Sequence, residues 1–265
     1  MTTGNPDRKL ALITGASSGI GAVFATQLAQ RRHDLILVAR RRDRLEQLAA
    51  ELSEKQGVTA EVIEADLAGE AGVSAVEERL RSPGVDVLVN SAGFGSSGQF
   101  ADLPLKRELE EIDLNVRALV RLSHAALGPM VQRRRGGIVN IASTGAFQPV
   151  PYMATYAATK AFVLSFSEAL HEEVKEHGVS VTALCPGPVR TEFQQVAGVD
   201  EGRVPSMAWV SADNVVKSAL WALQAHRAST VPGLVNKGGM LTAKFAPRFV
   251  ARRVAGSMFK RFGGA

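Results

Sequence analysis

Tyr156 and Lys160 lie four residues apart, and Ser143 lies thirteen residues before the tyrosine. Residues at positions i and i+4 of a helix share one face, so the ammonium of Lys160 would lie beside the phenol of Tyr156. An isolated tyrosine has a pKa of about 10, whereas an acid or base catalyst works best with a pKa near the operating pH. A unit charge ~4 Å away is worth up to ~4 kcal/mol at an effective dielectric constant of ~20, or roughly three pKa units. We therefore expect Lys160 to lower the pKa of Tyr156 and the pair to transfer protons.

Short apolar segments alternate with longer amphipathic segments before these residues and after them, which is typical of βαβ units in a parallel sheet. Helices are expected at Ile20–Arg31 and Asp43–Gln56. Strands are expected at Leu10–Thr14, Asp34–Ala39, Val58–Glu64, Val85–Asn90, Gly137–Ala142, Val179–Leu184 and Ser229–Val231. The pattern predicts an α/β fold with a doubly wound, seven-stranded parallel sheet flanked by helices.

A glycine-rich segment, Thr14-Gly15-Ala16-Ser17-Ser18-Gly19-Ile20-Gly21, follows the first expected strand and opens the first expected helix. In this context glycines let the backbone approach a pyrophosphate, which then rests on the positive end of the helix. A tight strand-to-helix turn with no ligand is the alternative. The context favours a dinucleotide site.

The end of the second expected strand indicates which dinucleotide is bound. An acidic residue about 20 positions beyond the loop would bind an adenosine 2′-hydroxyl. This chain has Ala39 followed by Arg40, Arg41 and Arg42. No carboxylate repels a 2′-phosphate there, and a guanidinium binds phosphate with paired hydrogen bonds. We predict NADP(H), with Arg40 as the leading contact and Arg41 as the second candidate.

The ordered motifs resemble those of the short-chain dehydrogenase/reductase family, and the resemblance extends from Lys9 to about Val231. The motifs are Thr14-Gly15-x-x-x-Gly19-x-Gly21, Asp66-Leu67, Asn90-Ser91-Ala92-Gly93, Asn115, Ser143, Tyr156-x-x-x-Lys160 and Pro186-Gly187-Pro188-Val189-Arg190-Thr191. The resemblance implies a Rossmann fold and an NADP-dependent interconversion of a ketone and a secondary alcohol. The segment after Val231 resembles the extensions of long-chain 3-oxoacyl and hydroxysteroid reductases.

The resemblance also implies a role for each residue of the site. Tyr156 would protonate the developing alkoxide, Ser143 would hydrogen-bond the same oxygen, Lys160 would hold the nicotinamide ribose, and Asn115 would maintain a proton relay through water. Asp66 would lie near the adenine, and Pro186 to Thr191 would flank the carboxamide. The implied cofactor contacts are Gly15, Ser17, Ser18, Gly19, Ile20, Gly21, Arg40, Asp66, Leu67, Asn90, Ala92, Gly93, Tyr156, Lys160, Pro186, Gly187, Val189 and Thr191.

Several alternatives stay open. Asn115 could satisfy backbone groups within a helix, Ser143 could end a strand, and Asp66 could cap the following helix. The whole chain could instead be an epimerase or dehydratase of the extended type, or a non-catalytic NADP(H)-sensing protein. The spacing of Gly15, Gly19 and Gly21 favours simple redox chemistry over the first, and the presence of both Tyr156 and Lys160 argues against the second.

The expected substrate is lipophilic, because apolar residues are frequent in two loops that would face it. The family resemblance implies that the first loop, at about 191–211, is a substrate lid, and the second loop follows Ser143. Their apolar residues are Phe193, Val196, Val199, Val204, Met207, Trp209, Phe147, Pro149, Val150, Tyr152 and Met153. We assign residues 1–233 to one catalytic domain and residues 234–265 to a basic helical extension.

Net positive charge is concentrated in the last part of the chain, which includes that extension. No Asp or Glu follows Asp213, whereas nine of the 31 Lys and Arg do, which leaves 22 cations against 26 acids in the first 213 residues. A helix beginning at Pro247 would be amphipathic. It could pack on its own or a neighbouring subunit, bind anionic lipid at a membrane surface, or recruit an anionic substrate carrier. No recognition motif accompanies the charge, so nucleic acid is not an expected partner.

Composition sets the remaining expectations. The chain of 265 residues is 46% hydrophobic, has no apolar run long enough to span a bilayer, and starts without a secretory signal pattern. A single cysteine excludes an internal disulfide. The five histidines have no ligand spacing, so we predict no metal and expect them at solvated helix positions. We expect a cytoplasmic protein, with membrane association at the surface as an option, and the family resemblance implies a homodimer or homotetramer.

Overall fold

The structure is a computed structural model that describes residues 8–82, 84–198, 206–245, 247, 249–250, 252–253 and 255–257. Its strands are β1 Leu10–Thr14, β2 Asp34–Ala39, β3 Ala60–Glu64, β4 Val85–Asn90, β5 Gly136–Ile141, β6 Val179–Leu184 and β7 Ser229–Thr230. Its α-helices are α1 Gly19–Gln30, α2 Arg42–Gln56, α3 Glu70–Arg81, α4 Leu105–Ile112, α5 Leu119–Gln132, α6 Ala154–Val174, α7 Phe193–Ala197, α8 Ala212–Gln224 and α9 Leu234–Phe245. The expected strands are all present, with ends that differ by up to two residues.

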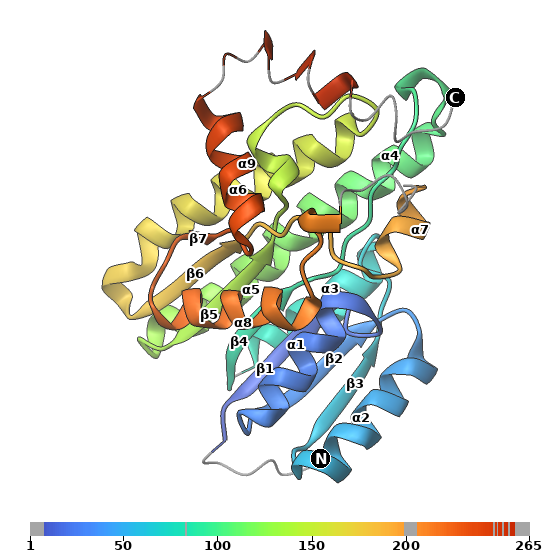
Figure 1. The fold of residues 1–265 in the computed structure, drawn as a ribbon. Coiled ribbons are helices and arrows are strands. Elements are labelled where there is room, and N and C mark those ends of the chain that lie inside the picture. The colour runs from blue at the N-terminus through green and yellow to red at the C-terminus, as the bar shows by residue number, and fades with distance from the viewer. Residues whose placement is uncertain are drawn as a thin grey trace.

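The strands form one parallel sheet in the order β3-β2-β1-β4-β5-β6-β7 (Figure 1). The strand order reverses between β1 and β4, which are neighbours in the sheet although β4 follows β3 in the chain. Ligands of doubly wound sheets bind at the carboxyl ends of the strands beside such a switch point. The predicted α/β fold is confirmed, and the glycine-rich segment after β1 lies at that point.

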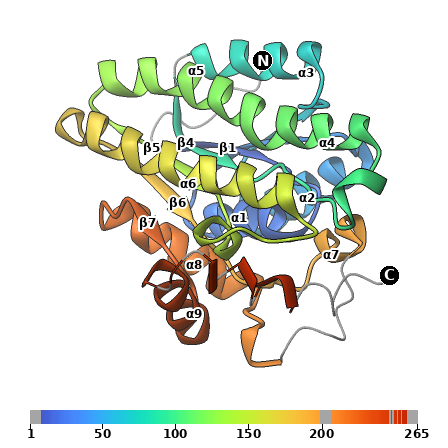
Figure 2. The same ribbon diagram turned by 90° about the horizontal axis from the view of Figure 1, so that it is seen from above.

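Helices cover both faces of the sheet (Figure 2). Alternate residues of a strand face opposite sides, so Ala11 and Ile13 of β1 pack with α1, α2 and α8, whereas Leu12 packs with α3 and α5. All three residues are fully buried. Two apolar cores of this kind hold the sheet rigid, and the rigid sheet fixes the loops at its carboxyl edge.

One histidine differs from the expectation that all five are solvated. His171 of α6 is buried, and its Nδ1 lies 2.9 Å from the carbonyl oxygen of Val181 in β6. The helix turns this position toward the sheet, where a ring nitrogen satisfies a backbone carbonyl. Helical spacing alone does not say which face of a long helix lies against the sheet.

Parts of two expected segments lie outside the described residues. The lid at about 191–211 includes α7 and a short 3₁₀ turn at Ser206–Ala208, but residues 199–205 are not described. The helix expected from Pro247 falls largely on residues that are not described, whereas helix α9 begins thirteen residues earlier. Within the described part of the chain, no helix is both long and apolar enough to cross a membrane.

Candidate active site

The glycine-rich loop is held in shape by close backbone contacts. Gly15 has a φ of +67°, and a Cβ there would lie 2.9 Å from the Ala92 amide nitrogen. A Cβ on Gly21 would lie 2.3 Å from the Gly15 carbonyl oxygen. The Thr14 hydroxyl accepts hydrogen bonds from the amides of Ser91 and Ala92, each at 3.0 Å. Only glycine fits at these positions, and Thr14 fixes the β4 loop beside the β1 loop.

The start of helix α1 offers unused hydrogen-bond donors. Ser18 precedes the helix in extended conformation, and its side chain makes no capping hydrogen bond to the first turn. No acidic residue lies in that turn. Amides at a helix N-terminus, together with the positive end of the helix dipole, favour a phosphate group. The loop therefore has the backbone shape and the free donors that a dinucleotide pyrophosphate needs.

Arg41, rather than Arg40, lies against this loop. Its guanidinium donates to the Ser17 hydroxyl at 3.0 Å and to the Ser18 hydroxyl at 2.8 Å. It also forms a 2.8 Å ion pair with Glu192 at the start of the lid. Hydrogen bonds from Arg44 and Arg41 lower the pKa of Glu192 to about 2. By contrast, the Arg40 side chain is exposed and bonds to no other described residue.

Tyr156 and Lys160 share one face of α6, as their spacing predicts, and Ser143 approaches them from the end of β5. The Lys160 Nζ lies 5.7 Å from the centre of the Tyr156 ring and donates to the Ile141 carbonyl oxygen at 2.8 Å. Ser143 is two residues past β5, where its hydroxyl accepts from the Gly145 amide at 3.1 Å. Ser143 and Tyr156 lie close together, because a Cβ on Gly145 would be 3.4 Å from the Ser143 Oγ and 4.0 Å from the Tyr156 Cε1. These three residues therefore meet, and Ser143 lies beyond the strand rather than ending it.

The expected fall in the pKa of Tyr156 is not what the protein produces by itself. Tyr156 is partly exposed by surface area, yet enough protein surrounds its phenol that burial raises its pKa to about 12, against a lowering effect of Ser143. Lys160 is buried, and burial lowers its pKa to about 8. For both groups, desolvation shifts the pKa more than the attraction between the ammonium and the phenol does, and the spacing of the two residues says nothing about desolvation.

Asn115 holds the backbone of a neighbouring loop. Its side-chain amide donates to the Phe94 carbonyl oxygen at 2.9 Å and to the Thr159 hydroxyl at 3.2 Å, and its oxygen accepts from the Phe94 amide at 3.2 Å. It lies in a π-helical segment, Asp113–Ala118, between α4 and α5. Such wide turns are frequent at functional sites. The backbone-satisfying role left open for Asn115 is therefore present, and it joins the loop to α6.

The Asn90 side chain belongs to a buried chain of hydrogen bonds. Its side-chain nitrogen donates to the Asn140 amide oxygen at 2.9 Å and to the Ser123 hydroxyl at 3.1 Å. Asn140 in turn donates to Ser167 at 2.9 Å. This buried chain ties β4 and β5 to α5 and α6, so the Asn90 side chain is already engaged away from the loop.

The remaining predicted contacts lie around the carboxyl edge of the sheet. Gly93 lies where Asn115 and Lys160 converge, since a Cβ there would be 2.8 Å from the Asn115 side-chain oxygen. Asp66 is exposed and accepts a hydrogen bond from the Ala68 amide at 3.1 Å, so it stabilises a turn and does not cap α3, whose N-cap is Gly69. Leu67 is buried beneath this turn.

The segment after β6 closes the other side of the loop. The Pro186 carbonyl oxygen accepts from the Thr144 amide at 2.9 Å, and Val189 is buried. Thr191 lies over the glycine-rich loop, because a Cβ on Gly19 would be 3.2 Å from the Thr191 side chain. Gly187 packs against Asn236 of α9. The predicted cofactor segments therefore lie around one edge of the sheet. Of the two arginines predicted as cofactor contacts, Arg41 is the one that lies against the glycine-rich loop.

Two buried carboxyl groups, Glu108 and Glu111 of α4, lie next to the site and were missed in the sequence. Glu111 is fully buried one helical turn before Asn115, and the Thr155 hydroxyl donates to Glu108. Burial raises the pKa of Glu111 to about 7, with Glu108 acting in the same direction and Lys160 against it. Glu111 in turn raises the pKa of Lys160. The position of Glu111 four residues before Asn115, which is one helical turn, is the sequence feature that could have placed Glu111 near the site.

Replacement of Glu111 by Gln is expected to stabilise the folded protein increasingly as the pH rises. Below about pH 4.5 both the folded and unfolded chains hold the Glu111 proton, whereas up to about pH 7 only the folded chain does. That contribution to stability is lost as the pH rises through about 7, and Gln has no proton to lose. The variant should gain up to about 3 kcal/mol over wild type between pH 4.5 and pH 8 in urea unfolding.

Glu110→Gln is the matched control, because Glu110 immediately precedes Glu111 and makes an exposed ion pair with Lys106. Its difference from wild type should vary with pH by less than about 0.5 kcal/mol. A Glu111→Gln difference as flat as that of the control would show that Glu111 titrates normally.

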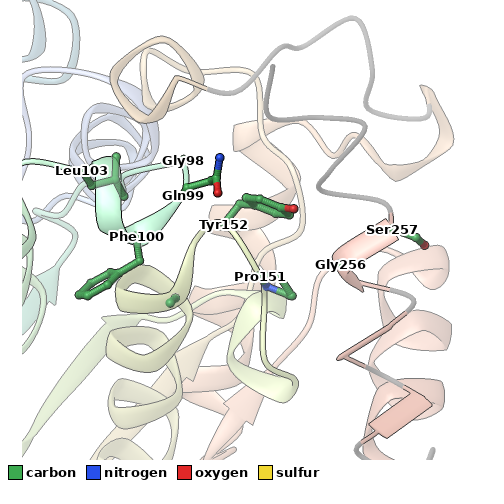
Figure 3. Close-up of a pocket in the computed structure, with 9 residues that line it drawn as sticks. Gly98, Gln99, Phe100, Leu103, Pro151, Tyr152, Gly256 and Ser257 are labelled. Atoms are coloured by element: carbon green, nitrogen blue, oxygen red, sulfur yellow. The ribbon is translucent and has the colours of Figure 1, made fainter. Parts of the chain in front are cut away.

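A cavity of about 430 Å³ lies beside the start of α6 (Figure 3). Its lining residues are Gly98, Gln99, Phe100, Leu103, Pro151, Tyr152, Ala154, Gly256 and Ser257. Tyr152 lies between the loop after β4 and the last described residues. On the inner side of that loop, Val150, Met153, Ala157 and Ala197 form an apolar cluster against Tyr156 and Phe193, whose rings are 5.3 Å apart. The surroundings of Tyr156 are therefore largely apolar.

Comparison with known proteins agrees with this geometry. The sequence profile of the short chain dehydrogenase family matches residues 9–202. The chain belongs to the short-chain dehydrogenase/reductase family. The family resemblance inferred from the sequence is confirmed. The match contains the glycine-rich loop and the Ser143, Tyr156 and Lys160 group.

Individual relatives of this short-chain dehydrogenase extend over most of the chain. A very-long-chain 3-oxoacyl-CoA reductase from Bos taurus is 34% identical over 79% of this chain and 67% of its own length. A solved short-chain dehydrogenase from Sphingobium yanoikuyae in complex with NADPH has a TM-score of 0.82 at 41% identity, covering 88% of this chain and 92% of its own. A bulky-bulky ketone specific alcohol dehydrogenase from Comamonas testosteroni has a TM-score of 0.77 at 34% identity, covering 91% and 95%.

This protein is therefore a dehydrogenase or reductase that acts on a carbonyl or alcohol group, and a nicotinamide dinucleotide is its cofactor class. The predicted oxidoreductase activity is confirmed at this level.

Proposed function

We propose that the protein is an NADPH-dependent reductase of bulky, lipophilic ketones, with Tyr156 as the proton donor. One observation carries the proposal: Ser143 and Lys160 both lie close to Tyr156, with the Lys160 Nζ 5.7 Å from the ring centre, and the pKa of the phenol is raised well above neutrality. A phenol that keeps its proton at pH 7 can donate it to a developing alkoxide. The protonated phenol is the form that reduction requires, and a pKa above neutrality maintains it at pH 7.

The polar residues would divide the work on the carbonyl oxygen. Ser143 and Tyr156 both present hydroxyl groups, and donors aimed at an oxygen that gains charge stabilise the transition state more than the ground state. The pKa of Lys160, about 8, leaves its ammonium mostly charged at pH 7. That charge lies close enough to the phenol ring to stabilise the phenolate that remains after proton donation.

NADPH, when bound, would supply the hydride for the carbonyl carbon. The β1 loop, with Gly15 and Gly21 in close backbone contact and the free amides at the start of α1, fits its pyrophosphate. Arg41, which follows β2, fits a 2′-phosphate, because its guanidinium already lies against the Ser17 and Ser18 hydroxyls of the glycine-rich loop. Lys160 fits the nicotinamide ribose.

The apolar surroundings of Tyr156 support a substrate with an apolar body. Val150, Met153 and Phe193 pack around the phenol, and the cavity beside α6 adds Phe100 and Leu103. Burying each methylene of a substrate against such walls is worth about 0.8 kcal/mol. The names of the two relatives that mention a long acyl chain and a bulky ketone point in the same direction.

A panel of ketones tests the substrate class. NADPH oxidation should proceed with kcat/KM values that rise roughly three- to fourfold for each added methylene until the site is filled. Small keto sugars should be poor substrates, because their hydroxyl groups lose hydration without gaining partners. A preference for keto sugars over lipophilic ketones would contradict the substrate class, and failure of every ketone despite NADPH binding would contradict the reductase.

A further inference from the structure

Helix α9 exposes its largest apolar residues. Leu234 is 85% exposed, Leu241 50% and Phe245 79%. They are spaced seven and four residues apart, so they lie along one face of the helix. The opposite face carries Asn236 and Met240, which are partly buried. A surface helix of a soluble domain has the reverse arrangement, with its apolar face inward.

The helix is nevertheless fixed on the protein in this orientation. The Asn236 amide donates to the carbonyl oxygens of Pro232 at 3.2 Å and Ala208 at 3.3 Å. Met240 packs against a buried cluster that includes Val163 and Val231. Figure 2 shows α9 outside the sheet. The outward position of the leucines and the phenylalanine therefore follows from a polar side chain that is bonded inward.

The segment of the chain that contains this face carries charge of one sign. No Asp or Glu follows Asp213, and nine Lys and Arg do. Lys237 lies on α9, and the described residues Arg252 and Arg253 are exposed beyond it, as are Phe249 and Val250. Exposed apolar side chains among cations suit the boundary between lipid headgroups and acyl chains, where each basic residue adds about 1 kcal/mol with anionic lipid.

We propose that α9 binds the surface of a membrane that contains anionic lipid, with Leu234, Leu241 and Phe245 entering the headgroup boundary. A second copy of the chain fits this face less well. A symmetric contact would place the same patch on both subunits and bring its cations together without any acid of this segment to pair with them. The binding goes beyond the reductase activity and does not depend on it.

Co-flotation of the full-length protein with vesicles tests the proposal. Wild type should float with phosphatidylcholine vesicles that contain about 30% phosphatidylserine, at least tenfold more than with phosphatidylcholine alone, and high salt should release it. Phe245→Glu should reduce flotation about tenfold, because it removes an apolar anchor and adds a repelled charge. Absence of wild-type flotation would overturn the proposal.

Trp221→Glu is the matched control, since Trp221 is also an exposed aromatic residue, at 57%, but lies on α8. It makes the same change of charge and should leave flotation within about twofold of wild type. Equal loss in both variants would show that total charge matters and the α9 face does not. Sedimentation of the protein without vesicles tests whether a second copy of the chain covers the α9 face. If wild type is a dimer that Phe245→Glu dissociates, and neither protein floats with vesicles, the face binds a second copy and membrane binding is refuted.

Discussion

Tyr156→Phe is expected to lower kcat for ketone reduction about 10³-fold, while the Kd for NADPH changes less than about threefold. The substitution removes one hydroxyl and keeps the ring that packs against Phe193 at 5.3 Å. The loss is large because the reaction leaves charge on the substrate oxygen, and a positioned acid contributes about 10²- to 10⁴-fold. Steady-state reduction at pH 7 measures kcat, and quenching of protein fluorescence by NADPH measures Kd.

The unfolding midpoint in urea controls for structural damage in this variant. The ring of Tyr156 is retained, so the midpoint should move by less than about 1 kcal/mol in free energy. Activity within tenfold of wild type would mean that another group donates the proton. Loss of both activity and NADPH binding would mean that Tyr156 is a binding residue first.

Arg41→Ala is expected to weaken NADPH binding roughly 10- to 150-fold, with NADH binding nearly unchanged. A hydrogen bond to a charged group contributes about 1.5–3 kcal/mol, and only NADPH carries the 2′-phosphate. Arg41 already bonds Ser17, Ser18 and Glu192, so little side-chain entropy is lost when a phosphate arrives. Direct titration with both cofactors, in the absence of ketone, gives the two Kd values.

Arg40→Ala is the matched control for cofactor choice, because it removes the same charge one residue earlier. The sequence alone favoured Arg40, and its prediction of an NADP contact is untested. We expect Arg40→Ala to weaken NADPH less than fivefold, the contribution of an exposed charge acting at longer range. If Arg40→Ala shows the larger loss, the sequence choice is right and the contacts of Arg41 are structural.

The fold could be predicted because its cause is local in the sequence. Short apolar segments that are buried on both faces, as β1, β2, β4, β5 and β6 are, are typical of parallel strands between helices. Leu12 and Ile13 of β1 pack on opposite sides of the sheet and illustrate this burial. Ser143, Tyr156 and Lys160 could be brought together because family motifs and helical spacing fix them relative to the sheet. Their pKa values could not, since desolvation depends on everything packed around them.

The features of the site that the sequence did not predict have one physical origin, which is contact between residues far apart in the chain. The Asn90 side chain is taken up by Asn140 and Ser123, and no local pattern announces that. Glu111 reaches the site because α4 packs on α6. Helix α9 presents its apolar face to solvent, so amphipathic spacing alone would assign its orientation the wrong way round. The cytoplasmic location and the homo-oligomer stay predictions.

The central claim is that this site reduces a ketone with NADPH, and transfer of a label tests it most directly. A lipophilic ketone is incubated with the protein and NADPH that carries deuterium at the reactive C4 position, and the alcohol is analysed by mass spectrometry. We predict that the alcohol gains one mass unit at its carbinol carbon and that Tyr156→Phe forms almost none. An alcohol without the label, or no alcohol from any lipophilic ketone while NADPH binds, would contradict it.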